Sequence, residues 1–191
     1  MSSEIKVDKI SPASGTSFTF GDSGDTFTVP SGATIANSGT ATGFGGANTP
    51  NFRATLSAQS ATLSGGTWTK ISPNTEAYDS DSAYTGGTFT VPSGKGGLYF
   101  IYANAYFSHT SVLRPQIAFY VNGSRVYTRG LYDENVNVAG YPEVVASAVL
   151  NLSATNTLEF YVRTSGADVE IYGDSNLANH PATFGAFKLI S

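Results

Sequence analysis

Apolar and polar residues alternate along short stretches of this chain, a pattern typical of β-strands that bury one face. Ten such stretches occur after residue 51, and residues that favour turns separate them. They span residues 52–57, 67–71, 88–91, 97–107, 116–121, 124–128, 144–150, 157–163, 168–172 and 184–190. No stretch keeps a helical period for longer than about a dozen residues. Ten strands without helices predict an all-β, antiparallel two-sheet sandwich of the jelly-roll kind.

Two of these stretches carry more specific information. LYFIYANAYF (98–107) is apolar at both alternating positions, which predicts a central strand that is covered on both sides. Asn122-Gly123 separates IAFYV from SRVYT. Because both residues of a tight hairpin turn need positive φ angles, Asn-Gly predicts a β-hairpin at this point.

The first fifty residues have a different character. They consist mainly of Gly, Ser, Thr, Asp and Ala, with short alternations at 17–20 and 26–29. Such a segment cannot bury enough apolar surface to fold alone, so it needs copies of itself or a larger scaffold. We therefore predict three parts: an extended anchor with short strands (1–37), a flexible Gly/Ser/Thr linker (38–51) and a head domain (52–191).

The phrase TFTVPSG occurs twice, at residues 26–32 and 88–94. Alternating Thr-Phe-Thr-Val predicts a half-buried strand, and Pro-Ser-Gly ends it by removing a hydrogen-bond donor and permitting a turn. Only the second copy leads directly into a strong strand. We interpret the identity as one strand-and-turn pattern used twice, and not as a duplicated domain.

Composition and charge narrow the function classes. Only 13% of residues are charged, the formal net charge is −4, and no Lys or Arg cluster occurs, so neither nucleic acid nor an anionic membrane is an expected partner. The chain has no cysteine, which excludes disulfides and thiolate metal sites. No apolar run is long enough for a leader peptide or a membrane span, so we expect export by another route or none.

Several motifs resemble one known family when taken in order. They are Phe52-Arg53-Ala54, GGTFTVPSGKGGLYFIYANAYF (86–107), Val121-Asn122-Gly123, VVASAVLNLSATNTLEFYVR (144–163) and ATFGAFKLI (182–190). Together they resemble the globular head of complement component 1q, within the tumour-necrosis-factor-like jelly rolls. The last motif is similar to the family's terminal "S-x-F-x-G-F-x-L" strand. This chain departs from the family at ATNTL (154–158), where "G-D-x-V" is frequent, and it has no collagen-like Gly-X-Y run.

This resemblance implies a homotrimer whose protomers meet along aromatic and aliphatic faces. It also implies that the head is a binding domain and not an enzyme. The N-terminal phrases SSEIKVDKISPASG and GDSGDTFTVPSGATIANSGTATGF resemble segments of tail-fibre and other appendage proteins of bacterial viruses. That second resemblance implies an anchor that docks a trimer on other virion proteins.

The strand aromatics are candidates for the core and for a trimer interface. Because they occur at both alternating positions, some must face a second surface, and a subunit interface explains this more economically than a ligand pocket. The candidates are Tyr99, Tyr102, Tyr106, Phe119, Phe160, Phe184 and Phe187. The longest irregular stretch, TRGLYDENVNVAGYP (128–142), has the composition of a recognition loop. Its candidate contact residues are Arg129, Tyr132, Asn135, Asn137 and Tyr141, and the alternative is a variable loop with no specific role.

The sequence contains only weak motifs for a metal site or a catalytic site. Asp79 and Asp81 stand two apart in a Gly/Ser-rich loop, as at the start of many calcium loops, and Asp133-Glu134 offers a second acidic pair. A weak Ca²⁺ site, which the family resemblance allows, and a solvated acidic loop both remain open, and no other cofactor is expected. GDSGD (21–25) looks like a serine-protease signature, but His109 and His180 are the only histidines and fall in predicted loops. We interpret GDSGD as a turn and predict no catalytic residues.

These observations predict a structural virion protein of a bacteriophage. It would be a trimeric tail fibre or capsid-decorating knob, made in the host cytoplasm and exposed on the particle exterior. Its head would contact a host-surface glycan, a host protein or the virion lattice. The alternative is a soluble, non-viral, lectin-like or cytokine-like trimeric binding module.

Overall fold

A computed structural model describes residues 10–12, 14–15, 17, 19, 21–36, 48–108, 114–130, 142–166, 168–175 and 181–189. The chain divides into two units, Met1–Phe44 and Gly45–Ser191, and each is described by itself. No helix in these ranges is long and apolar enough to cross a membrane. The predicted division into anchor, linker and head stays a prediction.

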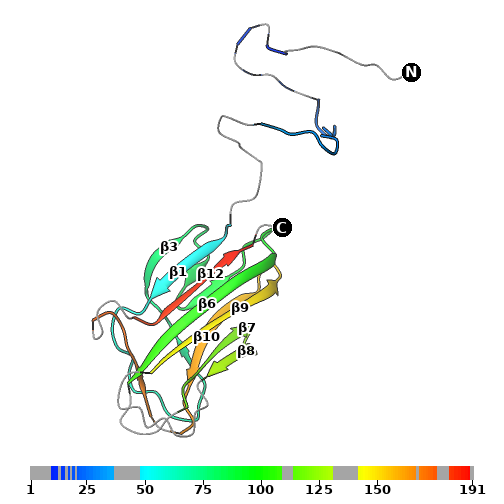
Figure 1. The fold of residues 1–191 in the computed structure, drawn as a ribbon. Helices are drawn as coiled ribbons and strands as arrows, with labels where there is room; N and C mark the ends of the chain where they lie inside the picture. Colours follow the sequence, from blue (N-terminus) through cyan, green and yellow to red (C-terminus); the bar gives the residue numbers. More distant parts are fainter. Residues whose placement is uncertain are drawn as a thin grey trace. The chain divides into compact units, whose positions relative to one another are not determined.

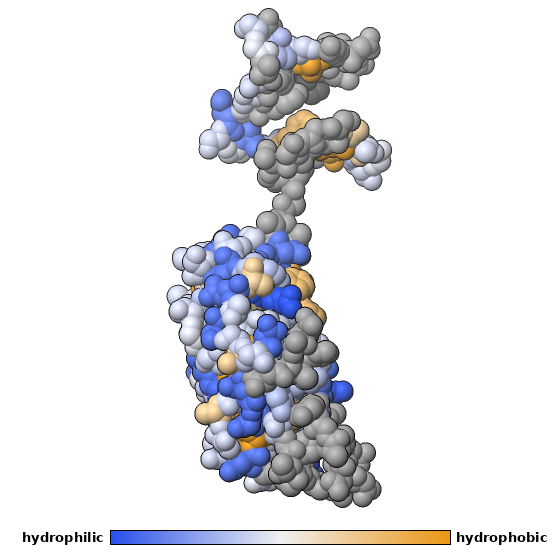
Figure 2. Space-filling model, turned by 90° about the vertical axis from the view of Figure 1, so that its left-hand side faces the viewer, coloured by the Kyte–Doolittle hydropathy of each residue, from blue (hydrophilic) through white to orange (hydrophobic). Residues whose placement is uncertain are grey.

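The first unit contains turns whose apolar side chains face solvent. The backbone N–H of Asp25 donates to the carbonyl of Asp22 at 3.0 Å, and the Asp25 carboxylate accepts the N–H of Asp22 at 2.8 Å. GDSGD is therefore a turn, as predicted. Phe27 is 69% exposed and Ile35 is 52% exposed, and apolar residues are visible on the surface of this unit in Figure 2.

The second unit is a sandwich of two six-stranded antiparallel sheets (Figure 1). Sheet 1 has the order β9-β6-β12-β1-β3, and β11 lies beyond the end of β12 on the same edge of β6. Its strands are β1 (Asn51–Thr55), β3 (Thr75–Asp79), β6 (Gly97–Ser108), β9 (Glu143–Leu152), β11 (Glu170–Ile171) and β12 (Thr183–Lys188).

Sheet 2 has the order β4-β5-β10-β7-β8, and β2 pairs with β10 beyond the end of β5. Its strands are β2 (Thr69–Ile71), β4 (Tyr84–Thr85), β5 (Thr88–Thr90), β7 (Gln116–Val121), β8 (Ser124–Gly130) and β10 (Thr157–Arg163). The chain passes several times from one sheet to the other, so neither sheet forms from a continuous segment.

All ten predicted strands are present within small shifts of their ends, but the described residues contain twelve. The two missed strands are β3 and β4. The sequence of β3, TEAYD, is almost entirely exposed and lies at the edge of sheet 1, where it pairs only with β1 through an irregular register at Arg53/Ala54. An edge strand without a buried face has no alternation to detect. β4 has only two residues, too few for any periodicity.

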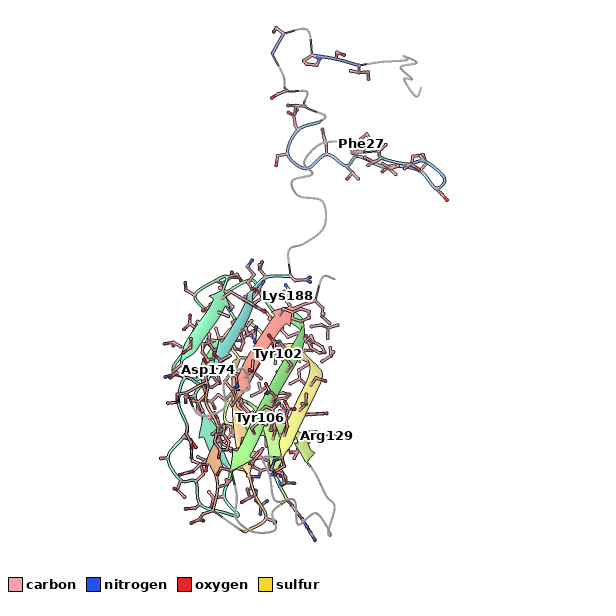
Figure 3. The ribbon with its side chains drawn as sticks, turned by 60° about the vertical axis from the view of Figure 1, so that its left-hand side comes forward. Phe27, Tyr102, Tyr106, Arg129, Asp174 and Lys188 are labelled. Atoms are coloured by element: carbon pink, nitrogen blue, oxygen red, sulfur yellow. The ribbon has the colours of Figure 1, made fainter. Side chains whose placement is uncertain are left out.

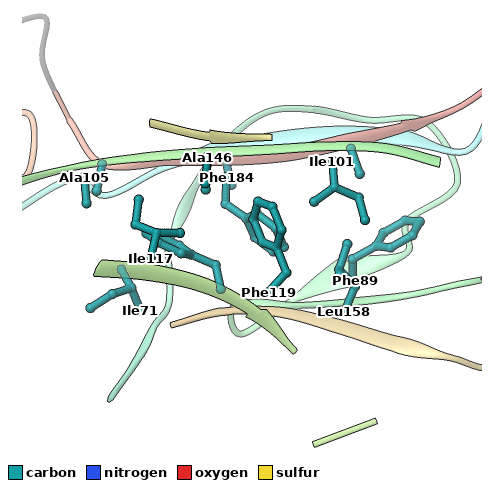
Figure 4. Close-up of a cluster of buried hydrophobic side chains, with 14 of the residues drawn as sticks. Ile71, Phe89, Ile101, Ala105, Ile117, Phe119, Ala146, Leu158 and Phe184 are labelled. Atoms are coloured by element: carbon teal, nitrogen blue, oxygen red, sulfur yellow. The ribbon is translucent and has the colours of Figure 1, made fainter. Parts of the chain in front are cut away.

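The core lies between the two sheets and is rich in aromatic rings (Figure 4). Phe184 of β12 is fully buried and contacts Phe52 of β1 with ring centroids 5.0 Å apart and Phe160 of β10 with centroids 5.8 Å apart. Phe52 also stacks on Phe89 of β5 at 4.9 Å. These rings therefore join strands from both sheets, and their burial is a main source of the unit's stability.

The hairpin between β7 and β8 has the predicted geometry. Asn122 has φ 51° and Gly123 has φ 74°, and Val121 pairs with Ser124 across the turn. The side-chain oxygen of Asn122 also accepts the backbone N–H of Thr157 at 2.9 Å. The turn therefore ends the β7–β8 hairpin and fixes it to the start of β10.

Candidate interaction surfaces

The outer face of sheet 1 carries apolar and aromatic side chains that no other layer among the described residues of the second unit covers. In β6 the odd-numbered residues from Tyr99 to Phe107 are buried in the core, whereas the even-numbered ones point outward and are half-buried. Tyr102 and Tyr106 lie on this outward side of β6 (Figure 3). LYFIYANAYF is thus central in its sheet as predicted, but the described residues of the second unit do not cover its second face.

Neighbouring strands extend this outer face. The strand register places Phe187 of β12 and Val149 of β9 on either side of Phe100 of β6. The Phe100 and Phe187 ring centroids are 5.3 Å apart. Val149 is 52% exposed and Val145, four residues earlier on β9, is 59% exposed. The result is a largely apolar surface over β12, β6 and β9, with Asn104 and Ser147 among its polar positions, which we call the sheet-1 face.

The polar part of the sheet-1 face centres on Tyr102. A Cβ atom at Gly185 would lie 2.4 Å from the Tyr102 ring, so the ring rests directly on the glycine of β12. Burial and a hydrogen bond with Tyr78 raise the pKa of Tyr102, and the charge of Arg53 opposes that shift. Tyr102 is therefore a neutral hydroxyl at physiological pH. Beside this group, Asn48, Asn51, Tyr78 and Phe187 line a pocket of about 340 Å³.

The predicted interface and core residues separate into two groups. Tyr102, Tyr106 and Phe187 lie on the sheet-1 face, whereas Tyr99, Phe119, Phe160 and Phe184 are fully buried in the core. Phe100, Val145 and Val149 belong to the sheet-1 face but were not among the predicted residues. The alternation within each strand could have identified them once the inward positions were known.

Sheet 2 has a second cluster of side chains on its outer face. The Tyr120 and Tyr161 rings stack with centroids 4.0 Å apart, and Trp68 meets Tyr120 edge-on at 6.4 Å. The guanidinium of Arg125 lies 5.3 Å from the centroid of the Trp68 ring. Sequence reasoning missed this cluster, because Trp68 precedes β2 and the other members belong to three different strands.

An ion pair borders the sheet-2 cluster. Lys70 Nζ lies 2.8 Å from Glu159 Oε1 and donates to Thr88 Oγ1 at 2.6 Å. Burial alone would raise the pKa of Glu159, but hydrogen bonds from Lys70 and Thr88 and the charge of Lys70 hold it below its usual value. The Tyr161 hydroxyl donates to Glu159 Oε2 at 3.4 Å. Glu159 is therefore ionised and paired at neutral pH.

The candidate calcium residues that the structure describes have protein partners. Asp79 Oδ2 accepts the backbone N–H of Tyr84 at 2.8 Å, across the turn between β3 and β4. Asp81 accepts the Ser80 hydroxyl at 2.6 Å and lies 3.9 Å from Lys95 Nζ. Among the described residues no group of three or more acidic, His or Cys side chains could hold a metal. Asp133 and Glu134 lie outside the described residues, and a Ca²⁺ site stays a prediction.

The predicted contact loop is described only at its ends. Arg129 is exposed near the end of β8 (Figure 3), whereas Tyr132, Asn135, Asn137 and Tyr141 lie outside the described residues. His109 and His180 do so as well.

Comparison with known proteins identifies the architecture. No protein-family model and no curated protein sequence matches the chain. Among solved structures, the PRD1 vertex protein P5 aligns with a TM-score of 0.55 and 14% identity, over 75% of this chain and 99% of that one. The Eiger tumour necrosis factor of S. frugiperda aligns with a TM-score of 0.50 and 16% identity, over 73% and 90%. The globular domain of zebrafish complement 1qA aligns with a TM-score of 0.46 and 16% identity, over 73% and 97%.

At such identities these likenesses concern the fold alone. The matched share corresponds in extent to the second unit, whose two antiparallel sheets contain no helix in the described residues. The predicted fold class is thereby confirmed, with twelve strands in place of ten. The second unit has a jelly-roll fold similar to those of the Eiger tumour necrosis factor and the PRD1 vertex protein P5.

Proposed function

We propose that this chain is a structural virion protein of a bacteriophage that forms a homotrimeric appendage, either a tail fibre or a capsid-decorating knob. The sheet-1 faces of three copies meet at the subunit interfaces. The N-terminal segment docks on other virion proteins, and the head is exposed on the particle exterior. No catalytic role is part of this proposal.

The sheet-1 face is the observation that carries the proposal. It combines half-buried aromatic rings, such as Phe100 and Phe187, with two valines that are more than half exposed. A contiguous apolar surface of this kind drives association when it is left uncovered. Because identical copies offer identical faces, a closed symmetric oligomer covers each face with its neighbours and leaves none free.

Two observations support a virion location. The fold is similar to that of the PRD1 vertex protein P5. In addition, Phe27 and Val29 of the first unit are exposed, whereas Phe89 and Val91, at the same positions of the repeated phrase, are fully buried in the second unit. Val29 and Ile35 of the N-terminal segment are exposed apolar residues, which suits a segment that docks on another protein.

The oligomeric state tests the proposal most directly. The full-length protein should be a trimer by mass photometry and by native mass spectrometry at micromolar concentration. Val149→Glu places a charge in the sheet-1 face and should yield monomers. Val126→Glu is the matched control, because Val126 is similarly exposed (47% against 52%) but lies on β8 of sheet 2. A wild-type monomer, or equal effects of the two variants, would contradict the proposal.

The second candidate is a soluble, non-viral, lectin-like or cytokine-like module, and the fold likeness to the Eiger tumour necrosis factor supports it. The two candidates differ in where the protein is found. Mass spectrometry of purified virus particles should detect many copies if the chain is a virion protein. Its absence from particles, with the protein present in the surrounding medium, would favour the second candidate.

A further inference from the structure

The outer face of sheet 2 carries a built arrangement of aromatic and cationic side chains, which we call the Trp68 cluster. It consists of Trp68, Tyr120, Tyr161 and Arg125, together with Arg163, which lies two residues after Tyr161 on the same side of β10. The two tyrosines come from the adjacent strands β7 and β10 and stack at 4.0 Å. Trp68 meets Tyr120, and Arg125 of β8 lies over the indole. The cluster therefore spans the sheet from the start of β2 to β8.

The rings are held in place by the sheet beneath them. Ala118 pairs with Tyr161 in the register of β7 and β10, on the outward-facing row, yet Ala118 is fully buried. Only neighbouring side chains on the outer face can cover a residue on that row. Trp68, Tyr120 and Tyr161 are each half-buried, so they pack on the sheet and still present part of their surface to solvent. Such rigid rings form a binding platform at little entropic cost.

The charges of the cluster are unbalanced. Glu159 is already paired with Lys70 at 2.8 Å. Among the described residues no carboxylate forms an ion pair with Arg125 or Arg163. Two uncompensated positive charges therefore lie on this face of a protein whose formal net charge is −4. A local cationic site on an acidic protein favours a small anionic ligand and disfavours a long polyanion such as nucleic acid.

Two hydrogen-bond donors in the cluster lack acceptors. Trp68 Nε1 and Arg163 Nε are buried and have no partner. Buried donors are nearly always paired, because an unpaired one destabilises the folded protein. Arg125 is exposed and lies over the indole, so a change of its rotamer would give a ligand access to Trp68. A ligand with acceptor oxygens beside an apolar face would satisfy both donors.

We propose that the Trp68 cluster binds an acidic saccharide of a cell surface, a sugar that carries a carboxylate. The apolar C–H face of the sugar ring stacks on the aromatic rings, and the indole N–H donates to a ring hydroxyl. The carboxylate binds the guanidinium of Arg163 or Arg125, because guanidinium and carboxylate match in geometry. The inference rests on the proposed function in one respect: with the sheet-1 face inside a trimer, the opposite face of the sandwich is exposed.

Trp68 is the single tryptophan of the chain, so its fluorescence reports on this site alone. Full-length protein should be titrated with a galacturonic-acid tetrasaccharide and a sialic-acid trisaccharide, with a neutral glucose tetrasaccharide and an oligothymidylate as controls. At least one acidic saccharide should change the Trp68 emission, and neither control should do so. Arg163→Gln should weaken the affinity about tenfold, since a hydrogen bond between two charged groups is stronger than one between neutral groups.

Arg53→Gln is the matched control, because Arg53 is an exposed arginine on the sheet-1 face, and it should leave the affinity unchanged. Trp68→Ala should abolish binding in calorimetry, and circular dichroism should verify that this variant is folded. The proposal is overturned if no acidic saccharide changes the emission, if oligothymidylate binds equally well, or if Arg163→Gln and Arg53→Gln behave alike.

Mass photometry of the same samples separates the two proposals. A trimer without binding overturns this inference alone, and a monomer that binds overturns only the trimer.

Discussion

At the scale of single residues, the repeated TFTVPSG phrase separates local from tertiary effects. In both copies the Pro-Ser-Gly segment forms the same turn: Ala33 N–H donates to Pro30 O and Lys95 N–H donates to Pro92 O, each at 3.1 Å. The glycine has a positive φ in both, 87° at Gly32 and 71° at Gly94. The phrase thus specifies its own turn. Whether its phenylalanine is buried depends on what the rest of the chain places around it.

This pair of phrases allows a matched stability test. Phe89→Ala removes a fully buried ring that stacks on Phe52 at 4.9 Å, and should lower the free energy of unfolding of the second unit by about 3–5 kcal/mol. Phe27→Ala changes the same residue in the same sequence, but Phe27 is 69% exposed, so the unfolding of the second unit should not change. Urea denaturation measures both variants, and similar losses would contradict the assigned core.

The Lys70–Glu159 pair makes stability depend on pH. The folded-state pKa of Glu159 lies below its unfolded value of about 4.3, so its contribution is full above that value and is lost as pH falls through the folded pKa. Glu159→Gln should therefore lower the free energy of unfolding by about 1 kcal/mol at pH 7. The difference in stability between this variant and the wild type should vanish at about pH 2. Thermal melts across this range test the expectation. Glu76→Gln, on exposed β3, is the control and should change the melting temperature at pH 7 much less than Glu159→Gln does.

At the scale of strands and turns, the β7–β8 hairpin depends on the backbone of its two turn residues. Gly123 has φ 74°, and a Cβ atom there would meet nothing within 4 Å, so substitution costs only backbone strain. Gly123→Ala should lower the free energy of unfolding by about 1–2 kcal/mol, the cost of a left-handed conformation. Ser124→Ala, one residue further along, should have little effect. Equal destabilisation by both variants in urea titrations would contradict this account.

At the scale of the whole molecule, the two outer faces of the sandwich differ in chemistry. The sheet-1 face is apolar and aromatic, whereas sheet 2 presents the Trp68 cluster with its two free arginines. A face of the first kind suits burial against identical copies, and one of the second kind suits a polar ligand. The jelly roll separates these roles because each sheet has one face in the core and one outside.

Assembly through the sheet-1 face predicts that folding and association are linked. The melting temperature of the wild-type protein should rise with protein concentration, because mass action favours the folded oligomer. Val149→Glu should melt lower and independently of concentration, whereas Val126→Glu should keep the dependence. Calorimetry over a hundredfold range of concentration measures this. A melting temperature of the wild-type protein that does not change with protein concentration would contradict an obligate trimer.

The sequence by itself determined the local features of this protein. The ten alternating strands, the Asn122-Gly123 hairpin and the Pro-Ser-Gly turns could be predicted, because they depend on side-chain alternation and on the φ angles that neighbouring residues permit. Only the tertiary structure decided which alternate face of β6 enters the core, that exposed β3 pairs with β1, and that Trp68 meets side chains of β7 and β8. Those relations join residues far apart in the chain. Alternating apolar and polar residues indicate that a strand has two different faces, but what covers each face depends on the strands packed against it.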